Sequence, residues 1–257
     1  MSSAAGEQPA ALYQRFADDL RRVRAEQRQL YERSAHSPMT RLPPYRWSRT
    51  AARKAGLDWE KRRWINPQLD DIEAELTYLR IRARRPEQVI EISPFRGWST
   101  TWILRALRDN GTGTLASFDL VKDSELFVPA ELAQRWRLVI GDVRGQLGEM
   151  PAEIDYLFLD SDHRAAFARW FIAELFPRLA PGAGVSVHDI FHRAKPRSGE
   201  ARVLLEWLEQ TGTEWFSASR LAPGGLHDEI KVRRQQLGFD APIHFGDHDS
   251  MVFFNAP

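Results

Sequence analysis

Two apolar runs of this sequence end in polar side chains that could share one chemical task. The run "IDYLFLD" ends at Asp160, and the run "GVSVHD" ends at His188 and Asp189. Parallel strands present their carboxyl ends at one edge of a sheet, so two carboxylates and an imidazole would converge there. We therefore expect the chemical step at this edge.

Acidic residues in three other apolar runs predict a binding site beside this trio. Glu91 precedes the turn Ser93–Gly97, the run "LASFDL" contains Asp119, and "VIGD" ends at Asp142. Asp119 is positioned to accept hydrogen bonds from a ribose diol, and Asp142 could hydrogen-bond an adenine amino group. These acids together describe a nucleoside pocket; the alternative for each is a turn-forming Asp after a buried strand.

The turn "SPFRG" indicates which nucleoside-containing cofactor the pocket would bind. It lacks the pattern G-x-G-x-x-G of a dinucleotide fold and keeps only Gly97. A pyrophosphate needs close approach of the backbone at several points, so NAD and FAD are disfavoured. S-adenosylmethionine fits, because its sulfonium needs no phosphate cradle and Glu91 is compatible with its positive charge.

The elements that must position these residues follow a regular pattern after Pro86. Five apolar runs read as buried strands, with helices in most intervening segments. They are Val89–Ile92, Leu115–Phe118, Leu138–Ile140, Ile154–Leu159 and Val185–Val187. The alternation predicts an α/β fold, a doubly wound and mostly parallel sheet covered on both faces. "TEWFSAS" and "SMVFF" predict a terminal antiparallel pair, separated by a loop from Arg220 to Asp249 without a convincing helix.

The segment before the sheet reads as a helical extension. Pro9 to Ser34 has apolar residues at helical spacing and predicts a docking or dimerisation helix. Ser37 to Trp64 is rich in Pro, Arg and aromatic residues and predicts a lid or oligomer arm, with a basic RNA-binding surface as the alternative. Asn66-Pro67 predicts the start of another helix, which Pro86 ends.

Composition restricts the class of protein. A chain of 257 residues with 43% hydrophobic residues can bury the core of one large α/β domain. A net charge of +1 provides no global field for nucleic acid or an anionic membrane, and the absence of cysteine excludes disulfides, thiolate zinc sites and cysteine nucleophiles. No run of about eighteen apolar residues and no signal peptide is found, so we expect a soluble cytoplasmic protein.

The stretch Glu91–Thr100, "EISPFRGWST", resembles the first motif of class I S-adenosylmethionine-dependent methyltransferases, in the form found in the catechol and caffeoyl-CoA O-methyltransferase branch. "IDYLFLDSDH" with "FPRLAPGAGVSVHDIFH" resembles the group that includes macrolide-sugar O-methyltransferases. The resemblance covers about Leu76 to Leu208; Ser93 departs from the usual glycine. It implies a Rossmann-like seven-stranded domain, which we expect over residues 67–257. The resemblance does not reach residues 1–66, which we expect from their own pattern to form a helical arm or lid. The implied cofactor-binding residues are Glu91, Ser93, Pro94, Gly97, Ser99, Thr100, Asp119, Asp142 and Asp160.

The same resemblance implies a metal site. Asp160 falls where the metal-dependent O-methyltransferases place their first carboxylate ligand, and His188-Asp189 fall where they carry Asp-Asn or Glu-Asp. A divalent ion with open positions could hold a substrate hydroxylate and lower the pKa of the hydroxyl. Magnesium prefers oxygen ligands, so His188 favours manganese or another transition metal, or does not ligate at all.

His163 is the first candidate for a general base. It falls where relatives carry a lysine near the reacting hydroxyl, and an imidazole with an ordinary pKa of about 6.5 can accept a proton near neutrality. The alternative is a histidine that caps the helix beginning "HRAAFARWF". His192 is the second candidate base, and Asp162 is predicted to cap the same helix.

Two loops that the quoted motifs largely leave uncovered are expected to set specificity. In "FHRAKPRSGEA", Lys195, Arg197 and Glu200 could contact a polar or anionic acceptor, or simply be solvated. The segment Arg220–Asp249 contains several His and Asp residues whose spacing matches no metal motif, so it reads as a mobile lid.

The sequence thus predicts transfer of a methyl group from S-adenosylmethionine to a hydroxyl of a small molecule, in bacterial natural-product biosynthesis, with Mg or Mn as a second cofactor. Alternatives are N- or C-methylation on the same fold, a cephalosporin-hydroxylase-like enzyme, and a non-catalytic partner protein. We expect no nucleic-acid or membrane partner, and a homo-oligomer formed through the N-terminal arm.

Overall fold

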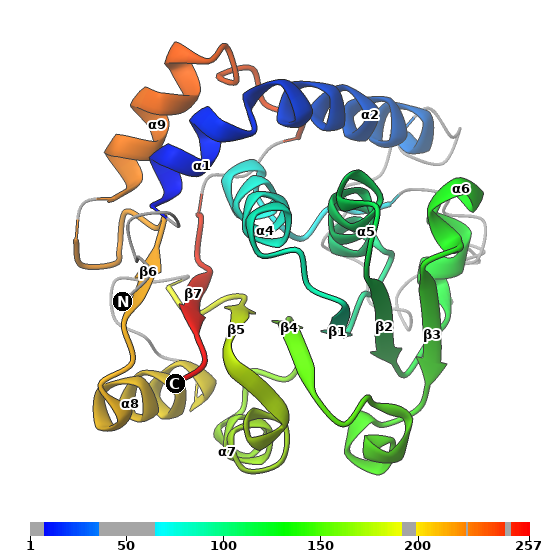
Figure 1. The fold of residues 1–257 in the computed structure, drawn as a ribbon, viewed down its shortest axis with the longest axis vertical. Helices are drawn as coiled ribbons and strands as arrows, with labels where there is room; N and C mark the ends of the chain where they lie inside the picture. Colours follow the sequence, from blue (N-terminus) through cyan, green and yellow to red (C-terminus); the bar gives the residue numbers. More distant parts are fainter. Residues whose placement is uncertain (1–7, 36–64, 192–198, 225, 245–247) are drawn as a thin grey trace, which may run out of the picture.

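A seven-stranded sheet organises the part of the chain that the structure, a computed structural model, describes: residues 8–35, 65–191, 199–224, 226–244 and 248–257. Its strand order is β3-β2-β1-β4-β5-β7-β6 (Figure 1). The strands are β1 (Gln88–Ile92), β2 (Thr114–Asp119), β3 (Trp136–Ile140), β4 (Ile154–Leu159), β5 (Leu179–Val187), β6 (Trp215–Ser217) and β7 (Val252–Asn255). Strands β1 to β5 are parallel, and β7 is antiparallel to both β5 and β6. The predicted doubly wound sheet and its terminal antiparallel pair are confirmed.

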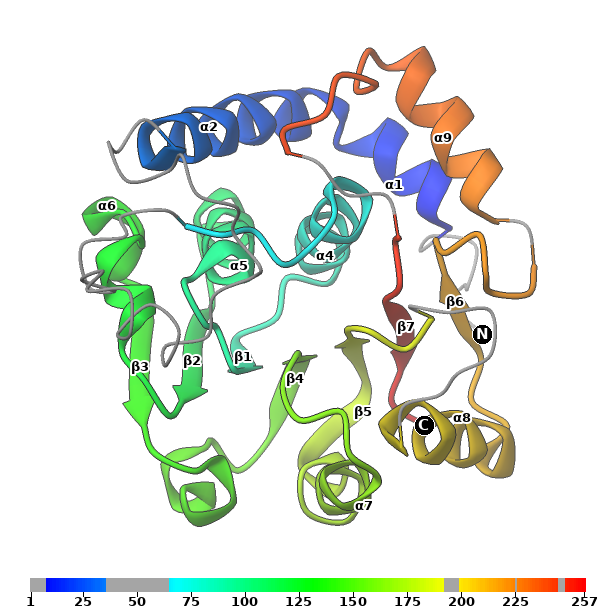
Figure 2. The same ribbon diagram turned by 180° about the vertical axis from the view of Figure 1, so that it is seen from behind.

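Helices cover both faces of this sheet (Figures 1 and 2). One face carries α1 (Pro9–Arg15), α2 (Ala17–Ala35), α4 (Asp71–Arg84), α5 (Trp98–Asn110) and α9 (Leu226–Gln236). The other carries α7 (Ala165–Glu174) and α8 (Gly199–Thr211). The shorter helical segments are η3 (Asp123–Leu126), α6 (Ala130–Ala133), η4 (Val143–Gly145), η5 (Leu147–Glu149) and η6 (Phe176–Arg178).

The two faces have separate hydrophobic cores because side chains alternate along a strand. In β4, Tyr156 and Phe158 pack into the core below α4 and α5, whereas Leu157 and Leu159 pack into the core with α7 and α8. A strand with both faces buried reads as a continuous apolar run, which is why "IDYLFLD" could be recognised. These runs fix the edge at which the polar residues after each strand emerge.

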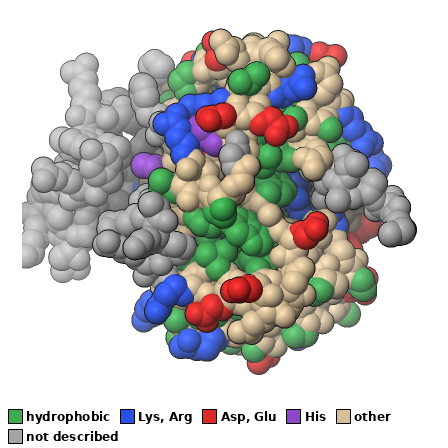
Figure 3. All heavy atoms as spheres, turned by 90° about the vertical axis from the view of Figure 1, so that its left-hand side faces the viewer, with side chains coloured by type: hydrophobic (Ala, Val, Ile, Leu, Met, Phe, Trp, Pro, Cys, Tyr) green, Lys and Arg blue, Asp and Glu red, His purple; other side chains and the backbone are tan. Residues whose placement is uncertain are grey.

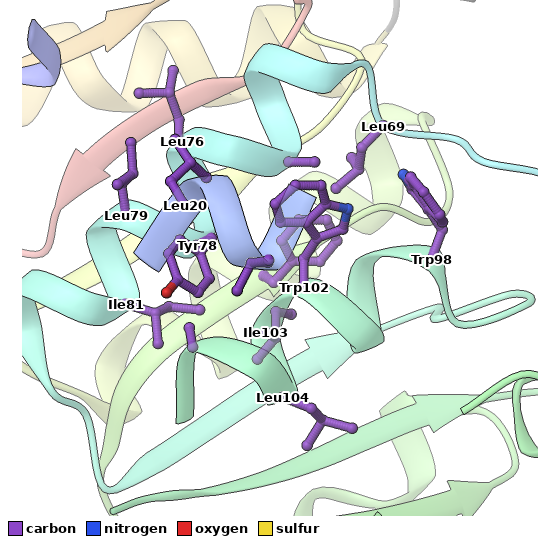
Figure 4. Close-up of a cluster of buried hydrophobic side chains, with 14 of the residues drawn as sticks. Leu20, Leu69, Leu76, Tyr78, Leu79, Ile81, Trp98, Trp102, Ile103 and Leu104 are labelled. Carbon is purple, nitrogen blue, oxygen red and sulfur yellow. The ribbon is translucent and has the colours of Figure 1, made fainter. Parts of the chain in front are cut away.

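Helices α4 and α5 form the centre of the first core. Figure 4 shows Trp98 and Trp102 of α5 beside Leu69, with Leu20 of α2 and Tyr78 of α4 in the same cluster. Trp102 is fully buried, and its ring meets Tyr78 edge to face at 6.4 Å between centroids. This packing fixes the position of α5, whose first residue follows the turn after β1.

The N-terminal helix differs from its prediction. Instead of one helix over Pro9–Ser34, α1 and α2 are separated at Phe16, whose φ of −113° and ψ of 24° interrupt the helical geometry. The predicted apolar stripe packs against the rest of the same chain. Leu12, Leu20 and Val23 are fully buried in the same core as α4 and α5. The division at residue 66 and the predicted oligomer stay predictions, and the predicted lid over Ser37–Trp64 lies outside the described residues.

Two further helix predictions are corrected. Helix α4 begins at Asp71 rather than at Asn66-Pro67, because Asn66 has a φ of 49° and the Asp70 backbone N–H donates to Glu73 Oε2 as in a capped helix start. The segment Arg220–Asp249 contains helix α9, where a loop without helix was expected. Only His227, Ile230 and Arg234 of α9 are buried, so its apolar pattern in the sequence is weak.

The side of the molecule where β6 forms the sheet edge is shown in Figure 3, with hydrophobic side chains gathered near the middle of that face. A cavity of about 300 Å³ lies there, between the start of α1 and the strands β6 and β7. Within the described ranges, no helix combines the length and the hydropathy needed to cross a bilayer.

Candidate active site

A cavity of about 590 Å³ lies at the carboxyl edge of the parallel strands, where the sequence placed the site. It contains predicted residues from the ends of β1, β2, β4 and β5, and from the segment after β3. Those predicted residues are Ser93, Asp119, Asp142, Asp160, Asp162, His163, His188 and Asp189. It is also lined by residues that the sequence did not indicate, among them Asn66, Gln68, Phe95, Arg144, Arg164 and Phe167.

The turn after β1 is an unusual backbone segment. Ser93, Phe95 and Gly97 all have positive φ, of 65°, 49° and 81°. A left-handed conformation is unfavourable for side chains other than glycine, so it needs external support. Asp119 provides it, because its Oδ2 accepts the Phe95 backbone N–H at 2.9 Å, while the Ser93 N–H donates to the Phe118 carbonyl at 2.8 Å. These contacts therefore hold Ser93 and Phe95 in a backbone conformation that usually favours glycine.

Glu91 lies beneath this turn and is fully buried. Its carboxylate accepts hydrogen bonds from Ser99 Oγ at 2.6 Å, Thr100 Oγ1 at 2.8 Å and Ser117 Oγ at 2.6 Å. Burial raises the pKa of Glu91 to about 7, against the opposing effect of these three hydroxyls. Through these hydrogen bonds, Glu91 connects β1 to α5 and to β2. Ser117 was not predicted from the sequence.

Several predicted cofactor-binding residues thus support the turn without lining the cavity. These are Glu91, Pro94, Gly97, Ser99 and Thr100. Position 97 favours glycine for two reasons. Its φ is positive, and a Cβ there would lie only 3.2 Å from Val128 Cγ2. Their contact with a cofactor stays a prediction.

Asp119 and Asp142 occupy the end of the cavity near β2 and β3. Burial raises the pKa of Asp119, and its Oδ1 also accepts the Val121 N–H at 3.2 Å. Asp142 is about half exposed and forms an ion pair with Arg144 at 2.5 Å, and the hydrogen bond from this guanidinium lowers the pKa of Asp142 to about 2. Asp142 is therefore a permanently charged acceptor that Arg144 already engages.

At the other end, His188 lies between carboxylates on both sides. Its Nδ1 is 3.1 Å from Asp160 Oδ1, and its Nε2 is 3.3 Å from Glu73 Oε2. Burial alone would lower the pKa of His188, but the charges of Asp160 and Glu73 and the hydrogen bonds to them raise it well above 6.5. Burial likewise raises the pKa of Asp160, and the charge of His188 outweighs this effect and lowers it.

His163 forms a second pair at this end of the cavity. Its Nδ1 is 2.7 Å from Glu200 Oε2, and its Nε2 is 3.5 Å from Asp189 Oδ2. The Glu200 side chain is buried, whereas about two fifths of the His163 side chain is exposed. The hydrogen bond to Glu200 raises the pKa of His163, with burial opposing it. The arrangement orients an imidazole whose second nitrogen faces the cavity.

The predicted metal ligands do not fit a resident ion. A histidine ligand must offer a ring nitrogen that carries no proton, and both nitrogens of His188 face carboxylates instead. Within the described residues, no group of three or more His, Cys, Asp or Glu side chains is arranged to hold a metal. His188 is therefore not placed to bind a metal ion through a ring nitrogen.

Other predicted roles are corrected or lie outside the described residues. Asp162 does not cap α7; the N-cap is Arg164, and Asp162 accepts the backbone N–H of that residue at 3.1 Å. Glu200 is buried in α8 against His163, so it is not the solvated loop residue that was one alternative. The candidate base His192 lies outside the described ranges, as do Lys195 and Arg197.

The histidines of the Arg220–Asp249 segment that the structure describes have structural partners. His227 Nδ1 lies 2.8 Å from the Ala218 carbonyl, and His244 Nε2 lies 2.6 Å from the Leu69 carbonyl. The His248 backbone N–H donates to Asp70 Oδ2. These contacts attach the segment to the fold and do not gather imidazoles at one point.

Comparison with known proteins agrees with this geometry. Residues 90–190 match the family model described as "Methyltransferase domain", which confirms the predicted resemblance over the centre of the sheet. No curated protein sequence matches the chain.

Solved structures confirm the fold. The O-methyltransferase TomG from Streptomyces achromogenes, involved in tomaymycin synthesis and solved with S-adenosylmethionine, has a TM-score of 0.54 at 15% identity, covering 89% of each chain. An O-methyltransferase from Bacillus cereus solved with S-adenosylhomocysteine has a TM-score of 0.52 at 12% identity, covering 81% of this chain and 88% of that chain. A putative caffeoyl-CoA O-methyltransferase from Staphylococcus aureus has a TM-score of 0.52 at 12% identity, covering 74% and 86%. The chain has the seven-stranded methyltransferase fold.

Proposed function

We propose that this protein transfers a methyl group from S-adenosylmethionine to a hydroxyl of a small-molecule acceptor. The observation that carries the proposal is the single cavity of about 590 Å³ whose two ends differ in chemistry. One end has the half-buried carboxylate of Asp119, and the other has the His163–Glu200 pair. A nucleoside at the first end would place its sulfonium near the acceptor at the second.

The comparisons support the cofactor and the reaction class. The matched family model is a methyltransferase domain, and the similar structures include proteins solved with S-adenosylmethionine or its product. TomG is described as acting in tomaymycin synthesis, which supports a natural product as the acceptor class here.

The residues of the cavity fit the cofactor. When bound, S-adenosylmethionine supplies a methyl group on a positively charged sulfur. Asp119 would hold the ribose diol with the lone pairs that its two backbone donors leave available, and Asp142 would hold the adenine end. Asp160 and Asp189 make the opposite end acidic, which suits a cation.

His163 supports a hydroxyl over an amine as the acceptor atom. A hydroxyl must lose its proton as its oxygen attacks, and Nε2 of neutral His163 is available to take it. Glu200 accepts the Nδ1–H and so fixes the tautomer that leaves Nε2 unprotonated. Closeness and alignment of the two reactants supply much of the remaining acceleration.

Calorimetry with S-adenosylhomocysteine tests the proposal. We expect saturable binding to the full chain, and a loss of roughly tenfold or more in affinity for Asp119→Asn, since a hydrogen bond to a charged group is removed. Asp155→Asn is the matched control: Asp155 also accepts two backbone N–H groups, from Glu87 and Gln88, but at the opposite end of the strands. Absence of heat with both S-adenosylhomocysteine and S-adenosylmethionine, together with binding of NAD, would overturn the proposal.

A further inference from the structure

Both ring nitrogens of His188 face carboxylates, whereas a histidine that binds a metal directs one nitrogen at the ion. The side chain is about nine-tenths buried, and the two carboxylates that face it come from different elements, α4 and the end of β4. A neutral imidazole has one N–H donor and one acceptor nitrogen, whereas carboxylates only accept. Both nitrogens of His188 face carboxylates, at 3.1 Å from Asp160 and 3.3 Å from Glu73, and an imidazolium, which has two N–H donors, matches this pair of acceptors.

We infer that His188 is a built-in cation that takes the place of a divalent ion in this site, and that Glu73 is the positioning residue that holds it there. Asp160 and Asp189 then share their edge with a fixed positive charge, since Nδ1 lies 3.1 Å from Asp160 Oδ1 and 3.6 Å from Asp189 Oδ1. The charge offsets repulsion between these carboxylates without a metal. The site is thereby organised before any ligand binds.

Glu73 is suited to this role because its own position is fixed. It is almost fully buried, and its Oε1 accepts the Met251 backbone N–H at 2.8 Å while Oε2 accepts the Asp70 N–H at 2.9 Å. Ser250 Oγ lies 3.3 Å from Glu73 Oε1 and 3.1 Å from Asp189 Oδ1. The carboxylate therefore joins the start of α4, the segment before β7 and the active-site edge.

Two measurements on the full-length protein test the cation directly. In a nitrogen-15 histidine spectrum, we expect His188, assigned by its loss in His188→Asn, to show two protonated ring nitrogens. Titration with Mn²⁺ alone should produce no stoichiometric paramagnetic broadening of the His188 signals. A neutral tautomer, or saturable Mn²⁺ binding that broadens these signals, would overturn the inference. Neither measurement depends on the proposed methyl transfer.

A third test uses turnover and so rests on the proposed function. Glu73→Gln keeps the size of the side chain and removes its charge, and we expect kcat to fall roughly 10- to 100-fold, the range for a lost charged hydrogen bond. Affinity for S-adenosylhomocysteine should change little, and the His188 signals should shift. Unchanged kcat and unchanged His188 signals would contradict the positioning role.

Glu75→Gln is the matched control, because Glu75 is also fully buried on α4 but binds Tyr13 and Arg234 away from the site. It should lower stability and leave the His188 signals in place. If Glu75→Gln moved those signals as much as Glu73→Gln, the effect would be structural and the inference would fail. If no variant or wild type bound S-adenosylhomocysteine, the proposed function would fail while the spectroscopic result still stood.

Discussion

At the scale of single residues, His163 predicts a pH dependence of activity. A general base works in its neutral form, and the hydrogen bond to Glu200 raises the pKa of His163 above its usual 6.5. The value of kcat/KM should therefore fall on acidification at a pH above 6.5, and Glu200→Gln should move this decline to lower pH. Glu206→Gln, at an exposed position of α8, is the control. An unchanged profile in His163→Ala would exclude His163 as the base.

Glu91 predicts a pH dependence of stability. Its pKa rises from 4.5 in the unfolded chain to about 7 in the fold, so between these values the folded protein keeps a proton that the unfolded chain releases. The contribution of Glu91 to the free energy of unfolding should be largest below pH 4.5. As the pH rises from 4.5 to about 7, this contribution should fall by up to about 1.4 kcal/mol per pH unit. Urea unfolding at several pH values would measure it.

Glu91→Gln should remove this part of the pH dependence, because the amide does not ionise. The exposed Glu87, which precedes the same strand, provides the control substitution Glu87→Gln. Identical slopes of unfolding free energy against pH in wild type and Glu91→Gln would show that Glu91 does not titrate in this window.

At the scale of elements, α2 is part of the folded core. Leu20 is fully buried, and Gln27 Nε2 donates to Thr101 Oγ1 of α5 at 2.9 Å. Leu20→Ala should lower the free energy of unfolding by about 2–5 kcal/mol, as for other buried leucines. Leu126→Ala, at a side chain that is 68% exposed, should change it by less than about 1 kcal/mol. Equal stability of the two variants would mean that α2 is not held in the core.

Helices and strands could be predicted where burial produces an apolar run or a periodic apolar pattern in the sequence. Strands β1 and β4 are apolar runs because both faces are covered, and α5 has a strong amphipathic pattern between Gly97 and Gly111. Strand β3 was predicted as a buried strand, but it lies at the edge of the sheet and is only partly covered, with Ile140 48% exposed. Helix α9 was missed because most of its surface is polar. The split at Phe16 was missed because a local change in backbone angles does not disturb the apolar spacing around it.

The site was predictable only in part for a related reason. Asp119, Asp160 and His188 follow strands, so the topology alone brings them to one edge. Glu73 and Glu200 lie on helices distant in the sequence, and their contacts with His188 and His163 depend on how those helices dock. No local pattern encodes such a contact. The metal ligands were predicted from the family resemblance, which gave no indication that Glu73 of α4 would face Nε2 of His188.

At the scale of the whole molecule, buried polar contacts connect the catalytic edge to the helical layer. Asp70 and Glu73 at the start of α4 accept backbone N–H groups of His248, Asp249 and Met251. The segment after α9 is thereby fixed to the same helix that positions His188. The N-terminal helices, α4, α9 and the active-site edge form one connected structure within the described residues.

The position of β7 between β5 and β6 has a consequence for synthesis on the ribosome. Strands β2 to β5 can pair as they emerge, because each finds a neighbour already made. Strand β6 is different: among the strands that the structure describes, its one sheet partner is β7, which follows helix α9 in the chain. Until β7 has been made, the aromatic side chains Trp215 and Phe216 belong to an unpaired strand, and a long loop must close before they are covered. In the nascent chain, this interval is when chaperone capture or aggregation competes most strongly with completion of the sheet.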